Sequence, residues 1–489
     1  MTLVNDHLPD GWITTTMGEV SDVVGGGTPK TTIPGNFDDA EGHPWLTPAD
    51  LTGHRAKTIS HGRRFLTDQG LKASAAKYMP AGTILFSSRA PIGYVAIAAN
   101  PVTTNQGFRS FVPSERLDPN YAYHYLRSIK ELAEQMASGT TFNELSGSKA
   151  KTLPIPLPPV DEQRRIADWL DKIDARQASI VDRLGATRAI VGRLRAAVLA
   201  AACSGRLTAD WRQEHPDATA GTVPSSPTSA EVALDVPATW ARCTLEEIAT
   251  SITSGPRDWS PYYNRGSSTF VMAQNVRPGR LDWSFHQAID PPADDPGRRR
   301  CQIEVGDVLV TIVGANTGDV APVLEDRAKH FVCQSVALLR PPDGEYAPYL
   351  SHWFNSVEHG RRYFEECMYG AGRPHLSFEQ LRKAPIAIPP AAERREIVTR
   401  VAAAVNIADR LDASVSAAEA TLDAASRASM FKAFRGELMP PEPDQGAARN
   451  GDQGLGAAAA GTAGGPSAIT GARLGPAGDQ PVLSDAEVS

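Results

Sequence analysis

The chain has 489 residues, which suits two domains with additional segments. It contains no signal peptide and no apolar run of about 18 residues, so we expect a soluble, cytoplasmic protein without membrane contact. The net charge of −7 does not by itself indicate a nucleic-acid-binding protein, and five scattered cysteines without metal-ligand spacing predict reduced structural thiols.

Residues 1–153 are predicted to form a first α+β block. Short apolar runs at residues 83–86 and 94–98, interrupted by Gly, Pro and Asn, predict strands. A helix is predicted near residues 119–136. The block is long enough to bury a core of its own.

Residues 154–205 begin a segment that recurs 231 positions later, in residues 385–438. The first copy opens on Pro154-Ile155-Pro156-Leu157-Pro158-Pro159 and the second on Pro385-Ile386-Ala387-Ile388-Pro389-Pro390. At the far end, Ser204-Gly205-Arg206-Leu207 matches Arg435-Gly436-Glu437-Leu438 at the same offset. Because a loop would tolerate changes in length, the constant spacing predicts a rigid spacer used twice.

Apolar residues in both copies recur in alternating steps of four and three, which predicts two helices with heptad seams. Pro-Pro and a first-turn Glu mark each start, and Gly205 or Gly436 marks each end. About 43 helical residues would make a rod of roughly 65 Å. The predicted seam residues are Ile166, Leu170, Ile173, Ile180, Leu184, Val191, Leu194 and Val198 in the first helix, and Ile397, Val401, Leu411, Val415 and Leu422 in the second.

Residues 206–237 are predicted to be a linker, and residues 238–384 a second block that is weakly related to the first. Trp12 matches Trp240, and Asn105-Gln106 aligns with Cys333-Gln334. A strand is predicted at residues 308–313 and a helix near residues 348–367. Residues 439–489, rich in Gly and Ala and without periodicity, are interpreted as a disordered tail.

The second seam is rich in alanine and buries little by itself, so we expect it to pack antiparallel on the bulkier first helix of the same chain. The predicted fold class is α+β: two tandem α/β domains separated by two long helices, which form an antiparallel intramolecular coiled coil with pseudo-two-fold symmetry. Homo-oligomerisation through the seams is the alternative interpretation.

Local basic clusters bear on nucleic-acid contact more than the net charge does, because phosphate attraction is screened beyond roughly 8 Å. A solvated face is the other interpretation of such clusters. Arg, Asn and Gln side chains read base edges best. Candidate base contacts are Arg89, Asn105, Gln106, Arg109, Asn275, Arg277, Asn316, Gln334 and Arg373, and candidate phosphate contacts are Arg55, Lys57, Arg63, Arg64, Arg298, Arg299 and Arg300. A structural role competes for each, most strongly for Gln106 and Gln334, which match across blocks.

The sequence offers no catalytic signature, so we predict a non-catalytic chain without a metal site. There is no Gly-Lys dipeptide and hence no P-loop, and no H-x-x-x-H pair. Gly25-Gly26-Gly27 precedes Thr28-Pro29, and a proline there predicts a turn rather than a cofactor loop. Ser, His and Asp residues show no triad pattern.

An ordered set of motifs covers residues 1–439. It comprises Gly27-Thr28-Pro29, Pro44-Trp45-Leu46-Thr47-Pro48-Ala49-Asp50-Leu51, residues 82–88, Thr104-Asn105-Gln106-Gly107, Leu157-Pro158-Pro159 with Glu162-Gln163, and Leu207-Thr208-Ala209-Asp210-Trp211-Arg212. With this set, duplicated around two equal helices, the chain closely resembles the specificity subunit of type I restriction–modification systems. The second block departs from the pattern, since it has Ser254-Gly255-Pro256 and no clear Trp-Leu-Thr-Pro counterpart.

The resemblance implies that each block is a target-recognition domain for one half of a split, non-palindromic site in double-stranded DNA. It also implies that the helices dock two methyltransferase subunits, which motor-nuclease restriction subunits join. S-adenosylmethionine, ATP and Mg²⁺ are then expected on those partners and no cofactor on this chain. The alternatives are the recognition subunit of a methylation-only or other phage-defence complex, and a bivalent coiled-coil protein adaptor that does not bind DNA.

Overall fold

The structure, a computed structural model, describes residues 8–89, 91–138, 143–218, 234–325, 330–370 and 372–437. Residues 219–233 of the predicted linker and the tail predicted for residues 439–489 lie outside the described residues.

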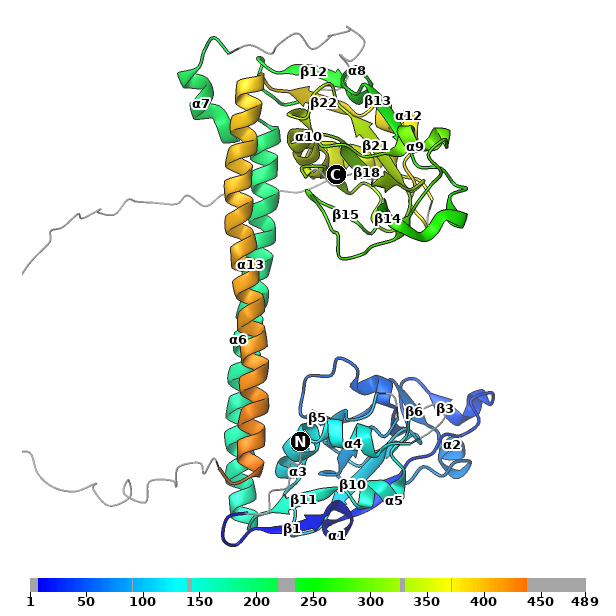
Figure 1. The fold of residues 1–489 in the computed structure, drawn as a ribbon. Coiled ribbons are helices and arrows are strands. Elements are labelled where there is room, and N and C mark those ends of the chain that lie inside the picture. The colour runs from blue at the N-terminus through cyan, green and yellow to red at the C-terminus, as the bar shows by residue number, and fades with distance from the viewer. Residues whose placement is uncertain are drawn as a thin grey trace, which may run out of the picture. The chain divides into compact units, whose positions relative to one another are not determined.

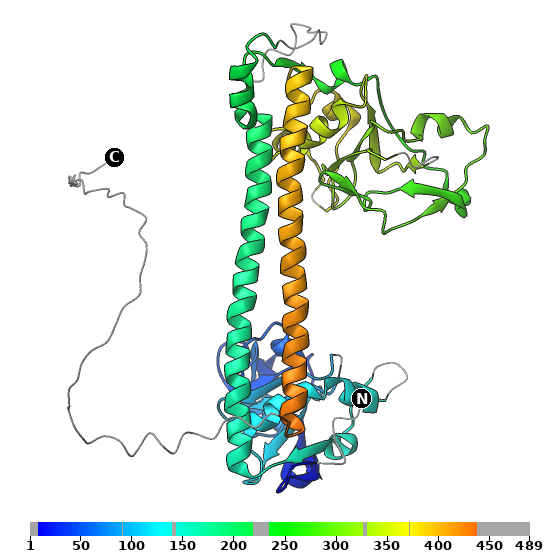
Figure 2. The same cartoon turned by 60° about the vertical axis from the view of Figure 1, so that its left-hand side comes forward.

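Two helices of equal length run antiparallel and side by side (Figures 1 and 2). Helix α6 spans Val160–Cys203 and α13 spans Ala391–Phe434, each with 44 residues. The sequence prediction of two long helices in an antiparallel pair is thereby confirmed. Each helix begins directly after Pro-Pro, and each is followed by a glycine with positive φ, Gly205 at +76° and Gly436 at +71°. Glycine adopts this left-handed conformation without the steric cost that a Cβ brings.

The first block combines two larger sheets and the two-stranded sheet β1-β11 with short helices. Its larger sheet has the strand order β2-β10-β7-β8-β5 and its smaller one the order β3-β6-β4-β9. The elements are β1 Ile13–Thr16, α1 Met17–Val20, β2 Ser21–Gly25, β3 Phe37–Asp38, β4 His43–Leu46, β5 Thr58–Ile59, β6 Arg64–Leu66, α2 Asp68–Lys72, β7 Ile84–Phe86, β8 Val95–Ala98, β9 Thr103–Thr104, β10 Arg109–Pro113, α3 Pro119–Ser128, α4 Lys130–Met136, α5 Gly147–Lys151 and β11 Pro154–Leu157.

The second block repeats this plan with a four-stranded sheet, β13-β21-β18-β19, and a three-stranded sheet, β17-β14-β20. A short helix, α7 (Ala209–Glu214), precedes it. Its elements are β12 Ala241–Thr244, α8 Leu245–Ile248, β13 Ser251–Ser254, β14 Tyr263–Val271, β15 Val276–Arg277, β16 Arg280–Leu281, β17 Ala288–Ile289, α9 Pro296–Cys301, β18 Val308–Thr311, β19 Val320–Pro322, β20 Phe331–Val332, β21 Val336–Arg340, α10 Tyr346–Asn355, α11 Gly360–Cys367, α12 Phe378–Arg382 and β22 Pro385–Ile388.

The helix predicted in each block is in fact two helices. In the first block it breaks at Ile129, between α3 and α4. In the second it breaks between α10 and α11, where a Cβ on Gly360 would lie 2.7 Å from the Phe354 ring. The glycine thus permits α11 to fold back on α10, and Phe354 and Phe364 stack at 4.9 Å.

Each block shares one core with both long helices. In the first block, this core includes Ile166 and Leu170 from the start of α6 and Phe434 from the end of α13. The Phe434 ring meets Tyr121 edge-on at a centroid distance of 5.3 Å. In the second block, the core includes Cys203 from the end of α6 together with the start of α13. A block therefore cannot move relative to the helix pair without breaking its own core.

The two junctions are built in the same way. In each block the first strand pairs antiparallel with the strand before a long helix, β1 with β11 and β12 with β22. The Tyr121 hydroxyl donates to the Pro156 carbonyl at 2.7 Å, and Tyr349 donates to Ala387 at the same distance. The internal repeat is therefore a repeat of the frame, by which we mean the two long helices with the strand pairs β1–β11 and β12–β22 that join each block to them.

Candidate nucleic-acid interface

The motifs of the first block converge on two loops that touch. The Gly27 N–H donates to the Thr104 carbonyl at 2.8 Å, and the Trp45 indole donates to the Gly27 carbonyl at 3.0 Å. A Cβ on Gly26 would lie 2.0 Å from the Asn105 carbonyl oxygen, so only glycine permits this approach. These motif residues hold the loops in place.

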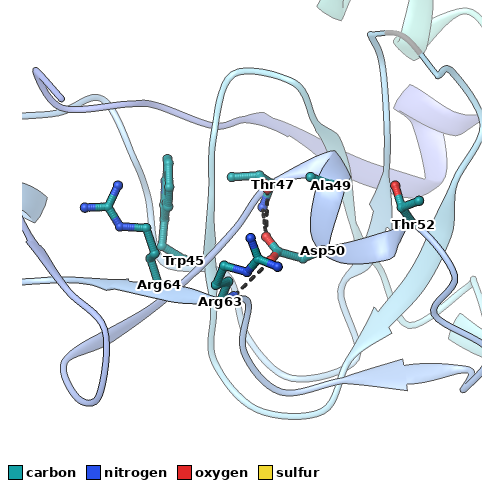
Figure 3. Close-up of a pocket in the computed structure, with 7 residues that line it drawn as sticks. All are labelled: Trp45, Thr47, Ala49, Asp50, Thr52, Arg63 and Arg64. Atoms are coloured by element: carbon teal, nitrogen blue, oxygen red, sulfur yellow. Dashed lines mark hydrogen bonds between the residues drawn. The ribbon is translucent and has the colours of Figure 1, made fainter. Parts of the chain in front are cut away.

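A cavity of about 410 Å³ opens beside this contact (Figure 3). Its lining residues are Trp45, Thr47, Ala49, Asp50, Thr52, Arg63 and Arg64. Asp50 is held by its neighbours: one carboxylate oxygen accepts from the Thr47 N–H and hydroxyl, both at 2.7 Å, and the other accepts from the Arg63 N–H at 2.9 Å. A second hollow of about 380 Å³ shares Asp50 and Arg63 and adds His54 and His61.

The two arginines at this cavity differ in how firmly they are held. Arg64 lies 4.0 Å over the Phe37 ring and 3.4 Å from the Asp39 carboxylate. Arg63 is exposed, and its guanidinium has no ion-pair partner in the part of the chain that the structure describes. The Arg63 backbone is thus held by Asp50, while its guanidinium is free to contact a ligand.

Two other candidates of the first block meet at Glu144, and two lie in the loop before β10. Arg109 and Arg89 approach its two carboxylate oxygens at 2.8 Å and 2.9 Å. The Asn105 side chain accepts from the Gly107 N–H at 2.9 Å, and Gln106 accepts from the Thr28 hydroxyl. Asn105 therefore shapes its own loop, whereas the half-exposed Arg89 and the exposed Gln106 still face solvent.

Lys57 points toward α6 rather than into solvent. Its ammonium lies 2.6 Å from Asp171 and 3.0 Å from the Asn120 side-chain oxygen. The Nε2 of the buried His124 donates to the same Asp171 at 2.7 Å. Burial alone would raise the pKa of Asp171, but the hydrogen bonds from Lys57 and His124 hold it below its ordinary value. We reassign Lys57 from phosphate contact to an anchor between this loop and α6.

Arg55 lies in the same loop and is largely exposed. Its guanidinium is 3.9 Å from the Asp182 carboxylate of α6, at the limit of an ion pair. With a side-chain exposure of 86%, it can leave this contact at little cost.

The second block contains the counterpart of the Trp-Leu-Thr-Pro motif that its sequence hides. Strands β4 and β9 pair parallel in the first block, as β14 and β20 do in the second, which aligns Trp45-Leu46 with Phe270-Val271. The Asn105 N–H donates to Leu46 at 2.9 Å, and the Cys333 N–H donates to Val271 at 3.0 Å. A Cβ on Gly255 would lie 1.8 Å from the Val332 carbonyl, so Gly255 permits the same close approach as Gly26.

This alignment places Asn275 where Asp50 lies, and it corrects the prediction that Asn275 contacts a base. Asn275 is fully buried, and its side-chain oxygen accepts from the Met272 N–H at 2.9 Å, as Asp50 accepts from Thr47. Its amide donates to Asp282 and Phe285, both at 2.8 Å. Because both amide hydrogens are used inside the block, Asn275 supports the loop.

The remaining candidates of the second block fall into held and open groups. Arg298 donates to the Pro291 carbonyl and lies 5.6 Å over the Phe331 ring, and the Asn316 amide reaches the Ala273 carbonyl at 3.5 Å. Arg277 is half-buried in the β15–β16 hairpin. The exposed candidates are Arg299, Arg300, Gln334 and Arg373.

The seam residues are buried to different degrees. Ile166, Leu170, Val191, Ile397, Val401 and Val415 are buried, and Ile173, Leu184, Val198 and Leu422 are half-buried. Ile180, Leu194 and Leu411 stay 40–43% exposed. Two helices alone, one of them lined with alanine, do not cover the larger side chains of the central seam.

Sequence reasoning missed the charged contacts that hold the frame. Glu393 is fully buried at the start of α13 and accepts from the Thr208 hydroxyl at 2.7 Å, from the Trp240 indole at 2.9 Å and from Arg212. The sequence did single out these residues, because Glu393 is the first-turn glutamate of the repeat and Thr208 and Arg212 belong to the motif at residues 207–212. Their contact across 185 positions, however, requires the fold.

Neither a metal cluster nor a membrane span is found among the described residues. No group of three or more His, Cys, Asp or Glu side chains there is arranged to hold a metal ion. No helix in the described ranges is long and apolar enough to cross a bilayer.

Comparison with known proteins finds similarity to one family. Residues 9–184 match the type I restriction modification DNA specificity domain. The specificity subunit of the type I restriction enzyme MjaIX of Methanocaldococcus jannaschii is 40% identical over 169 residues, which cover 34% of this chain and 39% of that protein. The EcoKI specificity subunit of Escherichia coli is 23% identical over 448 residues, covering 88% of this chain and 90% of that one.

A solved structure of the type I restriction–modification system, which addresses its assembly and conformational transition, contains a chain with the same fold. The TM-score is 0.65 at 20% identity, covering 89% of this chain and all of that one. Residues 9–184 thus match the specificity-domain family, and nearly the whole chain is similar to a type I restriction enzyme specificity subunit.

Proposed function

We propose that this chain is the DNA specificity subunit of a type I restriction–modification complex and that it reads a bipartite, non-palindromic target, one half with each block. The observation that carries the proposal is the shared core at each junction, where one block packs on α6 and α13 together. Two helices of equal length then fix the separation of the blocks, as a two-fold reader of half-sites requires.

The reading surfaces support a non-palindromic target because they differ. The first block offers Arg63 beside the Asp50 cavity, whereas the second has the buried Asn275 at the place of Asp50 and offers Arg299 and Arg300 instead. The equivalent residues Gln106 and Gln334 are exposed in both blocks. Exposed Arg and Gln side chains suit bidentate contacts to guanine and adenine, or contacts to phosphate. Unlike surfaces on a like frame should read unlike half-sites.

The helix pair suits two copies of one partner, for which we propose the methyltransferase subunits. Ile180 of α6 and Leu411 of α13 are equivalent positions of the repeat, and they are 42% and 43% exposed. Exposed large apolar side chains related by the pseudo-two-fold can be covered by two identical subunits. Motor-nuclease restriction subunits would join this core.

In this assignment the chain selects the site and the partners perform the chemistry. S-adenosylmethionine, ATP and Mg²⁺ would bind to the methyltransferase and restriction subunits. Because its substrate is cellular or invading DNA, the complex would act in the cytoplasm.

The test is a footprint of the assembled complex on DNA selected from a randomised duplex library. We expect two protected patches separated by a constant gap. Arg63→Ala should weaken binding by about 1–3 kcal/mol and relax one position if Arg63 reads a base, or weaken all sequences alike and lower the salt slope if it binds phosphate.

Arg427→Ala, an exposed cation on α13 outside both blocks, is the matched control and should bind as the wild type does. One protected patch, or none, would contradict the proposal and favour a protein adaptor.

A further inference from the structure

The two helices carry opposite charges at the centre of their contact. The Arg188 guanidinium of α6 meets the Glu419 carboxylate of α13 through two contacts of 3.1 Å. These residues are 231 positions apart, which is the offset of the internal repeat. They are therefore equivalent positions, and their contact marks the pseudo-two-fold point of the pair.

Because Arg188 contacts its own equivalent, Glu419, the charge at the centre depends on which helices pair. If α6 paired in the same register with α6 of a second copy of this chain, Arg188 would face Arg188. If α13 paired with a second α13, Glu419 would face Glu419. Both exchanged pairs place like charges at the centre, where the intramolecular pair places opposite ones.

A second set of ion pairs lies on one side of this point. Arg195 of α6 approaches Asp409 and Asp412 of α13, both at 2.6 Å. The repeat offset places Ser426 of α13 at the position of Arg195, and Val181 of α6 at that of Asp412. An exchanged α6 pair would set Arg195 against Val181, and an exchanged α13 pair would set Asp412 against Ser426. Both exchanged pairs therefore lose these contacts.

The ends of the helices are asymmetric in size. Phe434 at the end of α13 fills the first block against Tyr121 and Tyr125. Cys203, its equivalent on α6, is fully buried in the core of the second block. Exchange would leave a thiol where the ring belongs and force a ring where the thiol belongs, and both changes disturb a packed core.

The apolar seam does not make this choice. Ile180 and Leu194 of α6 remain 42% and 40% exposed against α13. The α13 residue equivalent to Leu194 is Ala425, so a second α6 would offer α6 a larger apolar face than α13 does. Hydrophobic contact would thus favour a second α6 as the partner of α6, while the same exchange would leave the alanine-rich α13 paired with another α13.

We propose that the charges of Arg188, Arg195, Asp409, Asp412 and Glu419, together with the residues at 203 and 434, select pairing of α6 with α13 over pairing of either helix with its own copy in a second chain. The uncharged Val181 and Ser426, which would face Arg195 and Asp412 after exchange, add to this selection. Flanking charges set partner choice in coiled coils in this way. If the blocks read DNA as proposed above, exchange would join two identical blocks through one helix pair, so the same residues keep the target non-palindromic.

The charge term is large enough to decide the outcome. An exposed ion pair shifts an equilibrium by a factor of roughly 1.4 to 5. Exchange between two chains loses three such contacts in each, and their product is at least roughly sevenfold before the like charges at the centre are added.

The first arm of the test is a cycle at the centre of the pair, in the full chain. Arg188→Glu and Glu419→Arg should each lower the folding equilibrium constant in urea roughly fivefold, and the doubly substituted chain should return to within about twofold of the wild type. Effects of the two substitutions that simply add, so that the double variant is the weakest, would overturn the proposal.

The second arm inverts the selection. A chain with Val181→Asp, Arg188→Gln, Asp409→Ser, Asp412→Arg, Glu419→Gln and Ser426→Asp has repulsive intramolecular pairs and attractive exchanged ones. Cys203→Phe with Phe434→Cys inverts the ends. Light scattering should give the 52.3 kDa mass of one chain for the wild type, and twice that mass for the chain with both sets of changes.

The matched control carries Arg193→Asp, Asp423→Arg and Arg427→Asp, which change exposed charges that make no ion pair among the described residues. It should keep the mass of one chain. A folded, fully inverted chain that also keeps this mass would overturn the proposal, as would a wild type with the doubled mass. Should the inverted chain not fold, the cycle at Arg188 and Glu419 decides. Neither readout involves DNA, so failure of the DNA assignment would leave both results interpretable.

Discussion

If α6 and α13 act as a ruler, removing one heptad from both helices should shorten the gap between half-sites and leave the half-sites unchanged. The best deletion removes residues 185–191 with their equivalents 416–422, because these heptads are centred on Arg188 and Glu419. The ends of both helices then keep their facing residues, and the register of Arg195 with Asp412 is preserved.

Seven residues of helix span about 10.5 Å, which equals the rise of about three base pairs at 3.4 Å each. The preferred gap should therefore shorten by about three base pairs. Three base pairs are also roughly a third of a helical turn, so one half-site turns away from its block and affinity for the new optimum should fall.

The assay is selection of bound duplexes from a library with both half-sites fixed and the gap randomised in length, read beside a second library with a fixed gap and randomised half-sites. Mapping of modified adenines in the host genome gives an independent reading. A chain lacking only residues 185–191 is the control, since its mismatched helices should lose stability rather than select a new gap. An unchanged gap, or altered half-site bases, would refute the ruler.

Three further predictions concern the frame. Glu393→Gln should lower the unfolding free energy in urea by about 3 kcal/mol, because it leaves Arg212 beside a neutral group in a buried site. Glu162 is the equivalent residue of α6, and its Oε1 has no hydrogen-bond partner among the described residues. Glu162→Gln should therefore cost under about 0.5 kcal/mol. Equal costs would show that the partners of Glu393 do not matter. Asn275→Ala should destabilise the second block by about 2–3 kcal/mol through three lost hydrogen bonds, while base preference in the folded fraction stays the same; a relaxed position in the target would instead return Asn275 to the reading surface. Burial lowers the pKa of His352 to about 4, so as pH falls the imidazole is protonated in the unfolded chain before it is protonated in the folded one. The unfolding free energy should therefore fall by about 2–3 kcal/mol between about pH 6.5 and pH 4. His352→Gln should remove this part of the pH dependence, and identical pH profiles of variant and wild type would contradict the prediction.

The long helices were predictable because two signals agreed on them. The constant offset of the anchors set their length, and the four-three spacing set their conformation, so the 44 residues of α6 and α13 match the prediction closely. The strands predicted at residues 83–86 and 94–98 were also found, as β7 and β8. Short apolar runs bounded by turn residues are typical of buried strands.

The interface residues were less predictable, for a physical reason. The side chains suited to reading DNA are those that also stabilise loops, and sequence does not reveal which partner each one has. Lys57 binds Asp171, 114 positions away in the sequence, and the Asn275 amide donates within its own loop. The equivalence of Asn275 with Asp50 becomes visible only through the parallel strand pairs β4–β9 and β14–β20, since the residues around it have diverged.

The pattern of what diverges and what persists between the two halves follows from the helices. Tyr121 and Tyr349 make the same 2.7 Å hydrogen bond at the two junctions, because each block must meet the same pair of helices at the same angle. Asp50 and Arg63 in one block and Asn275 in the other have no such constraint, because the hydrogen bonds that hold them stay within their own block. Lys57, in the same loop as Asp50 and Arg63, contacts α6 and belongs to the constrained part. New half-sites can therefore arise by change in these loops without loss of the frame, provided that the charges between α6 and α13 continue to pair each helix with its own partner.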